Sequence, residues 1–164
     1  TNAITYQEIF KLIISQQIWG GYIFNKTLEF EVPDNYQGFL REGRKYGKVP
    51  SITWFTNVNT VKRNQDLIMY RNYTPEDYPK FDNYPAINVD KVVDIPIDYD
   101  DLMGVPITFI DKYNPQQFEI VDAINRYALF DIFETNNFVR STHSHTCNIN
   151  GEAKYFRIII RRKK

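Results

Sequence analysis

The sequence predicts an α+β fold that is rich in strands, with one clear helix near its start. Three patterns favour this class: an early amphipathic run, several short β-branched and aromatic segments, and the pair Asn150-Gly151. That pair suits a two-residue type I′ turn between a strand ending near Ile149 and one over Ala153–Arg161. A second helix could lie between Val121 and Phe133. The 164 residues suit one domain, or one and a fraction.

The first helix is expected from Tyr6 to Gln16, where apolar side chains follow Ile9 at helical spacing. Thr5 and Glu8 have the spacing of a capping box. In this motif the Thr5 hydroxyl accepts a hydrogen bond from the Glu8 amide, and the glutamate reaches back to the threonine amide. We therefore expect the box to fix the start of the helix.

Short segments rich in β-branched and aromatic residues predict strands. They are Ile18–Phe24, Ile52–Asn57, Leu67–Tyr70, Pro106–Ile110 and Phe118–Asp122. Gly20-Gly21, within the first segment, would allow another backbone or a ligand to come close.

Two segments are expected to be irregular. Lys26–Val49 is broken by the turn-forming residues Pro33, Gly38, Gly43 and Gly47. Tyr73–Tyr99 combines prolines with aromatic residues and has little periodicity. Because proline fixes φ and removes a hydrogen-bond donor, this stretch should be an ordered wrap held by aromatic packing.

Composition narrows the class of protein. Lys plus Arg and Asp plus Glu each number 20, which disfavours a purely electrostatic binder of nucleic acid. The single cysteine excludes an intrachain disulfide and favours an intracellular, cytoplasmic protein. No apolar run approaches the roughly 20 residues that span a bilayer, so no membrane association is expected. A chain that starts at Thr1, without a methionine, is expected to be a fragment of something longer.

Short, non-periodic motifs run through much of the chain. They are Asn2-Ala3-Ile4-Thr5-Tyr6, Glu8-Ile9-Phe10, Trp54-Phe55-Thr56-Asn57, Asp82-Asn83-Tyr84, Gly104-Val105-Pro106-Ile107-Thr108-Phe109 and Asp111-Lys112-Tyr113-Asn114-Pro115. Together they resemble the EcoRI-type adenine-specific DNA methyltransferases over nearly the whole sequence. Such motifs are more specific than helix or strand periodicity, which arises easily in unrelated proteins.

The resemblance implies a part of a larger enzyme of a restriction-modification system. Adenine methyltransferases carry an Asp or Asn, Pro, Pro, aromatic motif after the fourth strand of a Rossmann-like sheet that binds S-adenosylmethionine. This sequence has neither that motif nor a glycine-rich turn between a strand and a helix, so no catalytic residue and no cofactor site are expected in it. Both would belong to a missing N-terminal portion.

The resemblance also implies a division of the chain and a DNA partner. Residues 1–58 would be the end of the catalytic sheet, a helix followed by an antiparallel strand pair formed by Ile18–Phe24 and Ile52–Asn57. Residues 59–164 would be a strand-rich, irregular region that recognises the target site in double-stranded DNA. Such regions contact base edges while the catalytic domain takes the flipped adenine.

Phe55 is the candidate for stacking on the flipped base, since an aromatic residue near this last hairpin does so in related enzymes. Alternation along a strand places Trp54 and Phe55 on opposite faces. The alternative is that both rings simply pack between sheet and helix.

Candidate DNA contacts come from basic and amide side chains. Asn114 can bind adenine bidentately and Lys112 can reach guanine or a phosphate, although Asn114-Pro115 is also a common start of a turn. Further candidates for phosphate contacts are Lys62, Arg63, Arg71, Arg126, Arg140, Arg161, Arg162, Lys163 and Lys164. The alternative for the basic C-terminal residues is a solvated end.

Two clusters invite other chemistry. His143, His145 and Cys147 alternate, but their spacing along a strand is wide for one tetrahedral metal ion, so no metal site is expected. A polar loop that touches DNA suits the two histidines better. Asp98, Asp100 and Asp101 are expected to form a solvated turn.

Two other functions are compatible with the sequence. One is a free-standing DNA-binding protein without catalysis, which the neutral net charge disfavours. The other is a protein-interaction domain that uses the aromatic, proline-rich middle as its binding surface.

Overall fold

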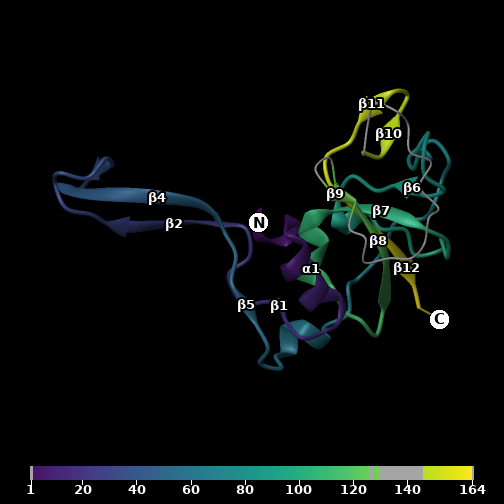
Figure 1. The fold of residues 1–164 in the computed structure, drawn as a ribbon, viewed down its shortest axis with the longest axis horizontal. Coiled ribbons are helices and arrows are strands. Elements are labelled where there is room, and N and C mark those ends of the chain that lie inside the picture. The colour runs from purple at the N-terminus through teal and green to yellow at the C-terminus, as the bar shows by residue number, and fades with distance from the viewer. Residues whose placement is uncertain (1, 126–127, 130–145, 164) are drawn as a thin grey trace.

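The computed structural model describes residues 2–125, 128–129 and 146–163. Figure 1 shows a mixed body of sheets, short helices and irregular segments, from which a long β arm extends to one side. The fold is α+β with mostly strands, as predicted. The helices in the described residues are all too short to cross a membrane.

The body is built on a five-stranded sheet with the order β6-β7-β12-β8-β9. These strands are Ile87–Asn88, Met103–Pro106, Arg157–Arg162, Phe118–Asn125 and Ala128–Leu129, in that order. All neighbours are antiparallel except β6 and β7, which are parallel. The central strand β12 carries Ile158, Ile159 and Ile160, each fully buried. A continuous apolar run of this kind is expected where a strand is covered on both faces.

The helix α1 (Gln7–Ile14) packs its apolar side onto the same core. Phe10 and Ile13 are buried, and the Phe10 ring meets the Phe156 ring edge-on at a centroid distance of 6.3 Å. Phe24 and Phe109 belong to this cluster too. One hydrophobic core therefore contains side chains from both the 1–58 and the 59–164 ranges.

The predicted antiparallel pair beside α1 is present, although each strand is short. β1 (Trp19–Gly20) pairs with β5 (Phe55–Thr56), with Trp19 opposite Thr56 and Gly20 opposite Phe55. The rest of the two predicted strands is extended or turning backbone, or belongs to the arm.

The arm is a three-stranded antiparallel sheet with the order β2-β4-β3. Its strands are Lys26–Glu31, Arg44–Ile52 and Phe39–Arg41, in that order. The prediction of an irregular Lys26–Val49 segment was therefore wrong. Gly47 lies within β4, where an added Cβ would be 3.1 Å from Val32 Cγ1, so this glycine permits close packing and does not mark a turn. Gly43, at φ +77°, does lie in the β3–β4 turn.

Three other local predictions were wrong. A 3₁₀ turn over Asn2–Thr5 makes Tyr6 the N-cap of α1, without a side-chain cap, so the capping box of Thr5 and Glu8 does not form as expected. Leu67–Tyr70 is not a strand. Beyond β7, the 3₁₀ helix η4 (Ile107–Lys112) replaces the strand expected over Pro106–Ile110, because its apolar side chains turn into the core.

Other predictions were confirmed. The strand predicted over Phe118–Asp122 is present as part of β8, which continues to Asn125. This strand excludes the helix expected over Val121–Phe133 at the start of that range. Most of the remainder of the range lies outside the described residues. The turn at Asn150-Gly151 has φ values of 52° and 78° and joins β10 (Asn148–Ile149) to β11 (Glu152–Ala153). The single strand expected over Ala153–Arg161 was wrong, because β11 ends at Ala153 and β12 begins at Arg157 in a different sheet.

The aromatic stretch Tyr73–Tyr99 is mostly irregular, as predicted. It contains only β6, the short 3₁₀ helix η3 (Val92–Asp94) and isolated bridges. Tyr73 stacks between Tyr78 and Tyr99, with centroid distances of 5.9 and 4.6 Å, so aromatic packing holds the wrap.

Candidate base-binding pocket and its polar frame

An open pocket of about 370 Å³ lies beside the β1–β5 pair. Its lining is largely apolar and comes from three segments that are distant in sequence. The lining residues are Gly21, Tyr22, Trp54, Phe55, Thr56, Thr60 and Lys62. Planar apolar walls with a few polar groups are typical of sites that bind small aromatic molecules.

The two aromatic residues of the Trp54-Phe55 motif differ in exposure. Trp54 is 58% exposed, whereas Phe55 is half-buried and packs against the main core. Tyr22, which also lines the pocket, is 94% exposed. The pocket thus has one ring anchored in the core and two that are free to meet a ligand.

Gly21, in the pocket lining, lets its backbone approach that of Trp54 closely. Its amide donates to the Trp54 carbonyl at 2.7 Å, and the Trp54 amide donates to the Ile23 carbonyl at 2.9 Å. A Cβ at residue 21 would be 3.1 Å from the Trp54 carbonyl oxygen. The expectation that this Gly-Gly pair allows close approach of another backbone is confirmed at Gly21.

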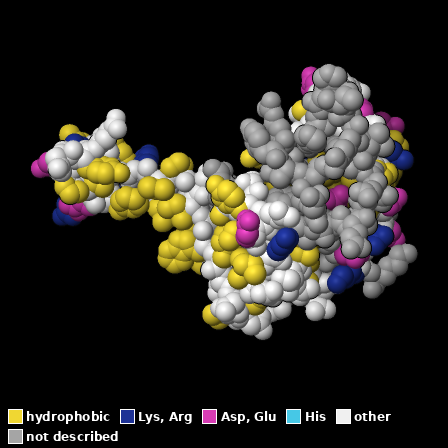
Figure 2. All heavy atoms as spheres, in the orientation of Figure 1, with side chains coloured by type: hydrophobic (Ala, Val, Ile, Leu, Met, Phe, Trp, Pro, Cys, Tyr) yellow, Lys and Arg dark blue, Asp and Glu magenta, His cyan; other side chains and the backbone are white. Residues whose placement is uncertain are grey.

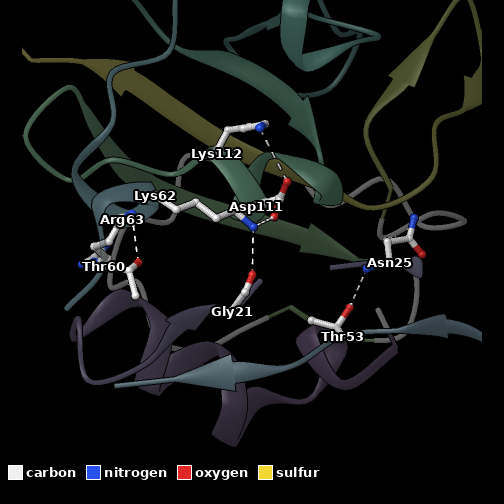
Figure 3. Close-up of polar contacts among 8 residues, drawn as sticks. All are labelled: Gly21, Asn25, Thr53, Thr60, Lys62, Arg63, Asp111 and Lys112. Atoms are coloured by element: carbon white, nitrogen blue, oxygen red, sulfur yellow. Dashed lines mark hydrogen bonds and ion pairs between the residues drawn. The ribbon is translucent and has the colours of Figure 1, made fainter. Parts of the chain in front are cut away.

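Lys62 belongs to the third segment of the lining, and Figure 3 shows its polar contacts. Its ammonium donates to the Gly21 carbonyl at 2.8 Å and to the Asp111 carboxylate. The other Asp111 oxygen lies 3.9 Å from the Lys112 ammonium. Lys62 therefore ties the β1–β2 connection to η4, and Asp111 brings the two lysines together.

The 3₁₀ helix η2 (Val61–Asn64) positions Lys62 and the neighbouring Arg63. The Thr60 hydroxyl caps η2 by accepting from the Arg63 amide at 3.3 Å (Figure 3). The Arg63 guanidinium lies 4.5 Å from the centre of the Trp19 ring and donates to the Tyr113 carbonyl at 3.5 Å. Burial lowers the pKa of this guanidinium. At 8% exposure, Arg63 contacts the protein interior and not solvent.

Asn114 is also an interior residue, with 2% exposure. Its amide donates to the Asp66 carboxylate at 2.8 Å, and its oxygen accepts from the Gln116 amide at 2.9 Å. These bonds stabilise the turn that the Asn-Pro pair favours. Lys112, by contrast, has a side chain that is 55% exposed.

A second, smaller pocket of about 200 Å³ shares Lys62 with the first. It is lined by Lys62, Gln65, Asp66, Leu67, Ile68 and Lys112. Lys62 lines both pockets, so it links the candidate Phe55 in the first pocket with the candidate Lys112 in the second.

The remaining candidates lie elsewhere. Arg161 and Arg162, on β12, pair with Glu119 at 2.8 Å and Asp100 at 3.7 Å. Arg71 lies 3.5 Å from Asp94. Arg126, Arg140, His143 and His145 lie outside the described residues.

Cys147 is buried in the core, and Asp98 and Asp101 accept hydrogen bonds from nearby backbone amides. Cys147 is 1% exposed, and Asp98 accepts from the Tyr73 amide at 2.7 Å. Asp101 accepts from the Leu102 amide at 2.8 Å. Within residues 2–125, 128–129 and 146–163, no group of three His, Cys, Asp or Glu residues could hold a metal ion.

Sequence reasoning missed Tyr22, Thr60 and the pairing of Asp111 with Lys62, although Asp111 beside Lys112 in the sequence did suggest the ion pair that these two form. Tyr22 directly follows the Gly-Gly pair, which was the available indication that this backbone meets a second segment. The pairing of Asp111 with Lys62 joins residues 49 positions apart, and no local pattern reports such a contact.

Comparison with known proteins identifies the family of the chain. The family described as adenine-specific methyltransferase EcoRI matches residues 1–163. The type II methyltransferases M.MgeORF184P of Mycoplasma genitalium and M.MpnI of Mycoplasma pneumoniae are 40% and 38% identical to the chain, and M.EcoRI of Escherichia coli is 37% identical.

Each alignment covers 99% of this chain. The chain spans about half the length of these curated relatives, namely 55%, 54% and 48%. No solved structure matches it. Because the family match extends over all but the last residue, the chain belongs to the EcoRI family of adenine-specific methyltransferases.

Proposed function

We propose that this chain is the C-terminal part of a site-specific DNA adenine methyltransferase of a restriction-modification system. In this proposal it holds the flipped adenine and reads the DNA site, while an N-terminal part supplies S-adenosylmethionine and the catalytic loop. The observation that carries the proposal is the apolar pocket between Tyr22 and the Trp54-Phe55 motif, in a member of this family.

The pocket suits an unstacked base because its walls are aromatic and its rim is polar. Enzymes that modify a base in duplex DNA extrude it and hold it between aromatic or apolar side chains. Phe55 is rigid because it packs on the core, and would define the plane of the base. Trp54 and Tyr22 are exposed and would close over it.

The lysines beside the pocket suit the DNA backbone. A base can enter the pocket only with its sugar and phosphates at the rim, where Lys112 is exposed and Lys62 is held by Asp111. Phosphate contacts from lysine position a duplex without carrying sequence information. Residues 59–164 would add the base-edge contacts, with Arg140, Arg161 and Arg162 as remaining candidates.

The described residues do not fit a cofactor site for S-adenosylmethionine. A nucleotide-like cofactor in a Rossmann-like sheet is held at a glycine-rich turn between a strand and a helix. The α-helix among the described residues, α1, is entered from the 3₁₀ turn Asn2–Thr5, which contains no glycine. The proposal therefore assigns the cofactor, and the chemistry of methyl transfer, to the N-terminal part.

The test is a full-length chimera in which this chain replaces the matching half of the Mycoplasma genitalium relative. The chimera is incubated with labelled S-adenosylmethionine and unmethylated DNA, and N6-methyladenine is measured by mass spectrometry. Because stacking on a base is worth about 1–3 kcal/mol, Phe55→Ala should lower the rate roughly 5- to 150-fold.

Tyr155→Ala is the matched control, since Tyr155 is 67% exposed and does not line the pocket. It should leave the rate unchanged. A folded chimera that binds DNA but transfers no methyl group would overturn the proposal.

A further inference from the structure

The β arm has two unlike faces. Cross-strand partners share a face of a sheet, and Leu28 is opposite Val49, Phe30 opposite Gly47, and Leu40 opposite Lys45. Since alternate residues of a strand point the same way, these pairs define one face. Apart from Gly47 and Lys45, that face is apolar: it carries Leu28, Phe30, Leu40 and Val49, with Val32 and Tyr36 packed near Gly47.

This apolar face is open to solvent. Leu40 is 74% exposed, Phe30 44% and Val49 41%. No residue of 26–52 belongs to either hydrophobic cluster of the body. In Figure 1 the arm extends away from the body, and Figure 2 shows hydrophobic side chains gathered along it.

The opposite face, called the charged face here, carries the rings of Phe39 and Tyr46 among charged side chains that pair with one another. Glu29 pairs with Arg41 at 3.0 Å and with Lys48 at 3.1 Å, and Arg44 pairs with Glu31 at 3.4 Å. Residues 26–52 contain five basic and four acidic side chains, so the arm offers no strong positive field of the kind that binds a phosphate backbone. Its apolar face points to a protein surface as the occupant, in preference to nucleic acid.

A single-layer sheet needs a cover for its apolar face. Small sheets gain stability in water by packing a hydrophobic face against another element. Within the described residues the body does not supply that element, because the arm extends away from it. The family match includes the whole arm, and the relatives are about twice as long as this chain. Every relative named above therefore contains additional chain from which a cover could come.

We infer that the apolar face of the arm is the docking surface for the N-terminal catalytic part, which packs an apolar face of its own against Leu28, Phe30, Leu40 and Val49. This inference rests on the proposed function, and it names the surface that joins the two parts. By packing against the catalytic part, the arm then holds that part in place beside the base pocket. The charged face stays in solvent.

Cysteine labelling tests this inference. Leu40→Cys, on the apolar face, and Arg44→Cys, on the charged face, are each made in the free chain and in the chimera. Both sites are exposed, so neither change should impair folding. Reaction with a maleimide is followed peptide by peptide by mass spectrometry. The native Cys147 is 1% exposed and reports unfolding if it labels.

We expect Leu40→Cys to label at least roughly tenfold more slowly in the chimera than in the free chain, because a covered side chain reacts only through transient opening. Arg44→Cys should label equally in both. Equal labelling of Leu40→Cys in a folded chimera would overturn the inference. So would protection of Leu40→Cys in the free chain that grows with concentration, since a second copy would then be the occupant.

The methylation assay separates the two proposals. A chimera that methylates DNA while Leu40→Cys stays accessible refutes the docking surface and leaves the proposed function standing. A chimera that protects Leu40→Cys, leaves Arg44→Cys reactive and transfers no methyl group refutes the function and leaves the docking surface standing.

Discussion

Replacing Lys62 with methionine tests the polar frame of the pocket. Methionine keeps most of the apolar stem but removes the ammonium that donates to the Gly21 carbonyl at 2.8 Å and to Asp111. Hydrogen bonds to charged groups stabilise a fold by about 1.5–3 kcal/mol. The side chains of Lys62 and Asp111 are 29% and 24% exposed, so water reaches both of them. Lys112 also lies 3.9 Å from Asp111. The lower part of that range therefore applies.

We therefore expect Lys62→Met to lower the free energy of unfolding by about 1.5–2 kcal/mol. For a chain of this size that corresponds to a fall in Tm of about 3–8 °C. Unfolding in urea can be followed by tryptophan fluorescence, because Trp19 and Trp54 both lie at the site. Lys91→Met, at an exposed lysine beside η3, is the control and should change stability little.

A double-mutant cycle with Asp111→Asn isolates the contact between the two side chains. We expect a coupling free energy of about 1 kcal/mol, since residues in one ion-pair network are not additive. A coupling below about 0.3 kcal/mol, the ordinary error of additivity, would refute the view that this pair holds the pocket wall.

Three further predictions concern the body. Gly104→Ala should destabilise the fold by about 1–3 kcal/mol in urea unfolding, because the new Cβ would lie 2.4 Å from Cε2 of the buried Phe81 ring; an unchanged midpoint would contradict this. Burial raises the pKa of Cys147 to about 12, so the folded chain should resist alkylation at pH 8 and react once urea unfolds it. For the same reason, the free energy of unfolding should fall as the pH rises from about 9 toward that pKa. Burial also raises the pKa of Asp122, which accepts from Tyr84 at 3.0 Å. The contribution of Asp122 to the free energy of unfolding is then largest below the unfolded pKa of about 4, and it is lost as the pH rises through the folded pKa. The stability of Asp122→Asn should therefore fall less than that of the parent chain between about pH 4 and 7. Parallel curves of stability against pH for the two proteins would contradict the assignment.

Local chemistry decided which elements could be predicted from sequence. The Asn150-Gly151 turn was predictable because both residues favour the positive φ that a type I′ turn requires. The arm was not, because Gly47 and Pro50 are residues that usually interrupt strands, yet both lie inside β4. There the packing of Val32 against Gly47 outweighs intrinsic preference.

The candidate site shows the same division. Residue type and family resemblance led to Phe55 and Lys62, and both line the pocket. Arg63 and Asn114 were chosen by type as well, but each is held in the interior by a partner 50 residues away. Contacts of that separation depend on the completed fold and leave no local trace in the sequence.

The position of β12 limits when the five-stranded sheet can form during synthesis. The strand between β7 and β8 is the last of the three to leave the ribosome, so its two neighbours cannot hydrogen-bond to each other and must wait for it. Nascent chains that stall before Arg157 should therefore present two open sheet edges to chaperones or to one another.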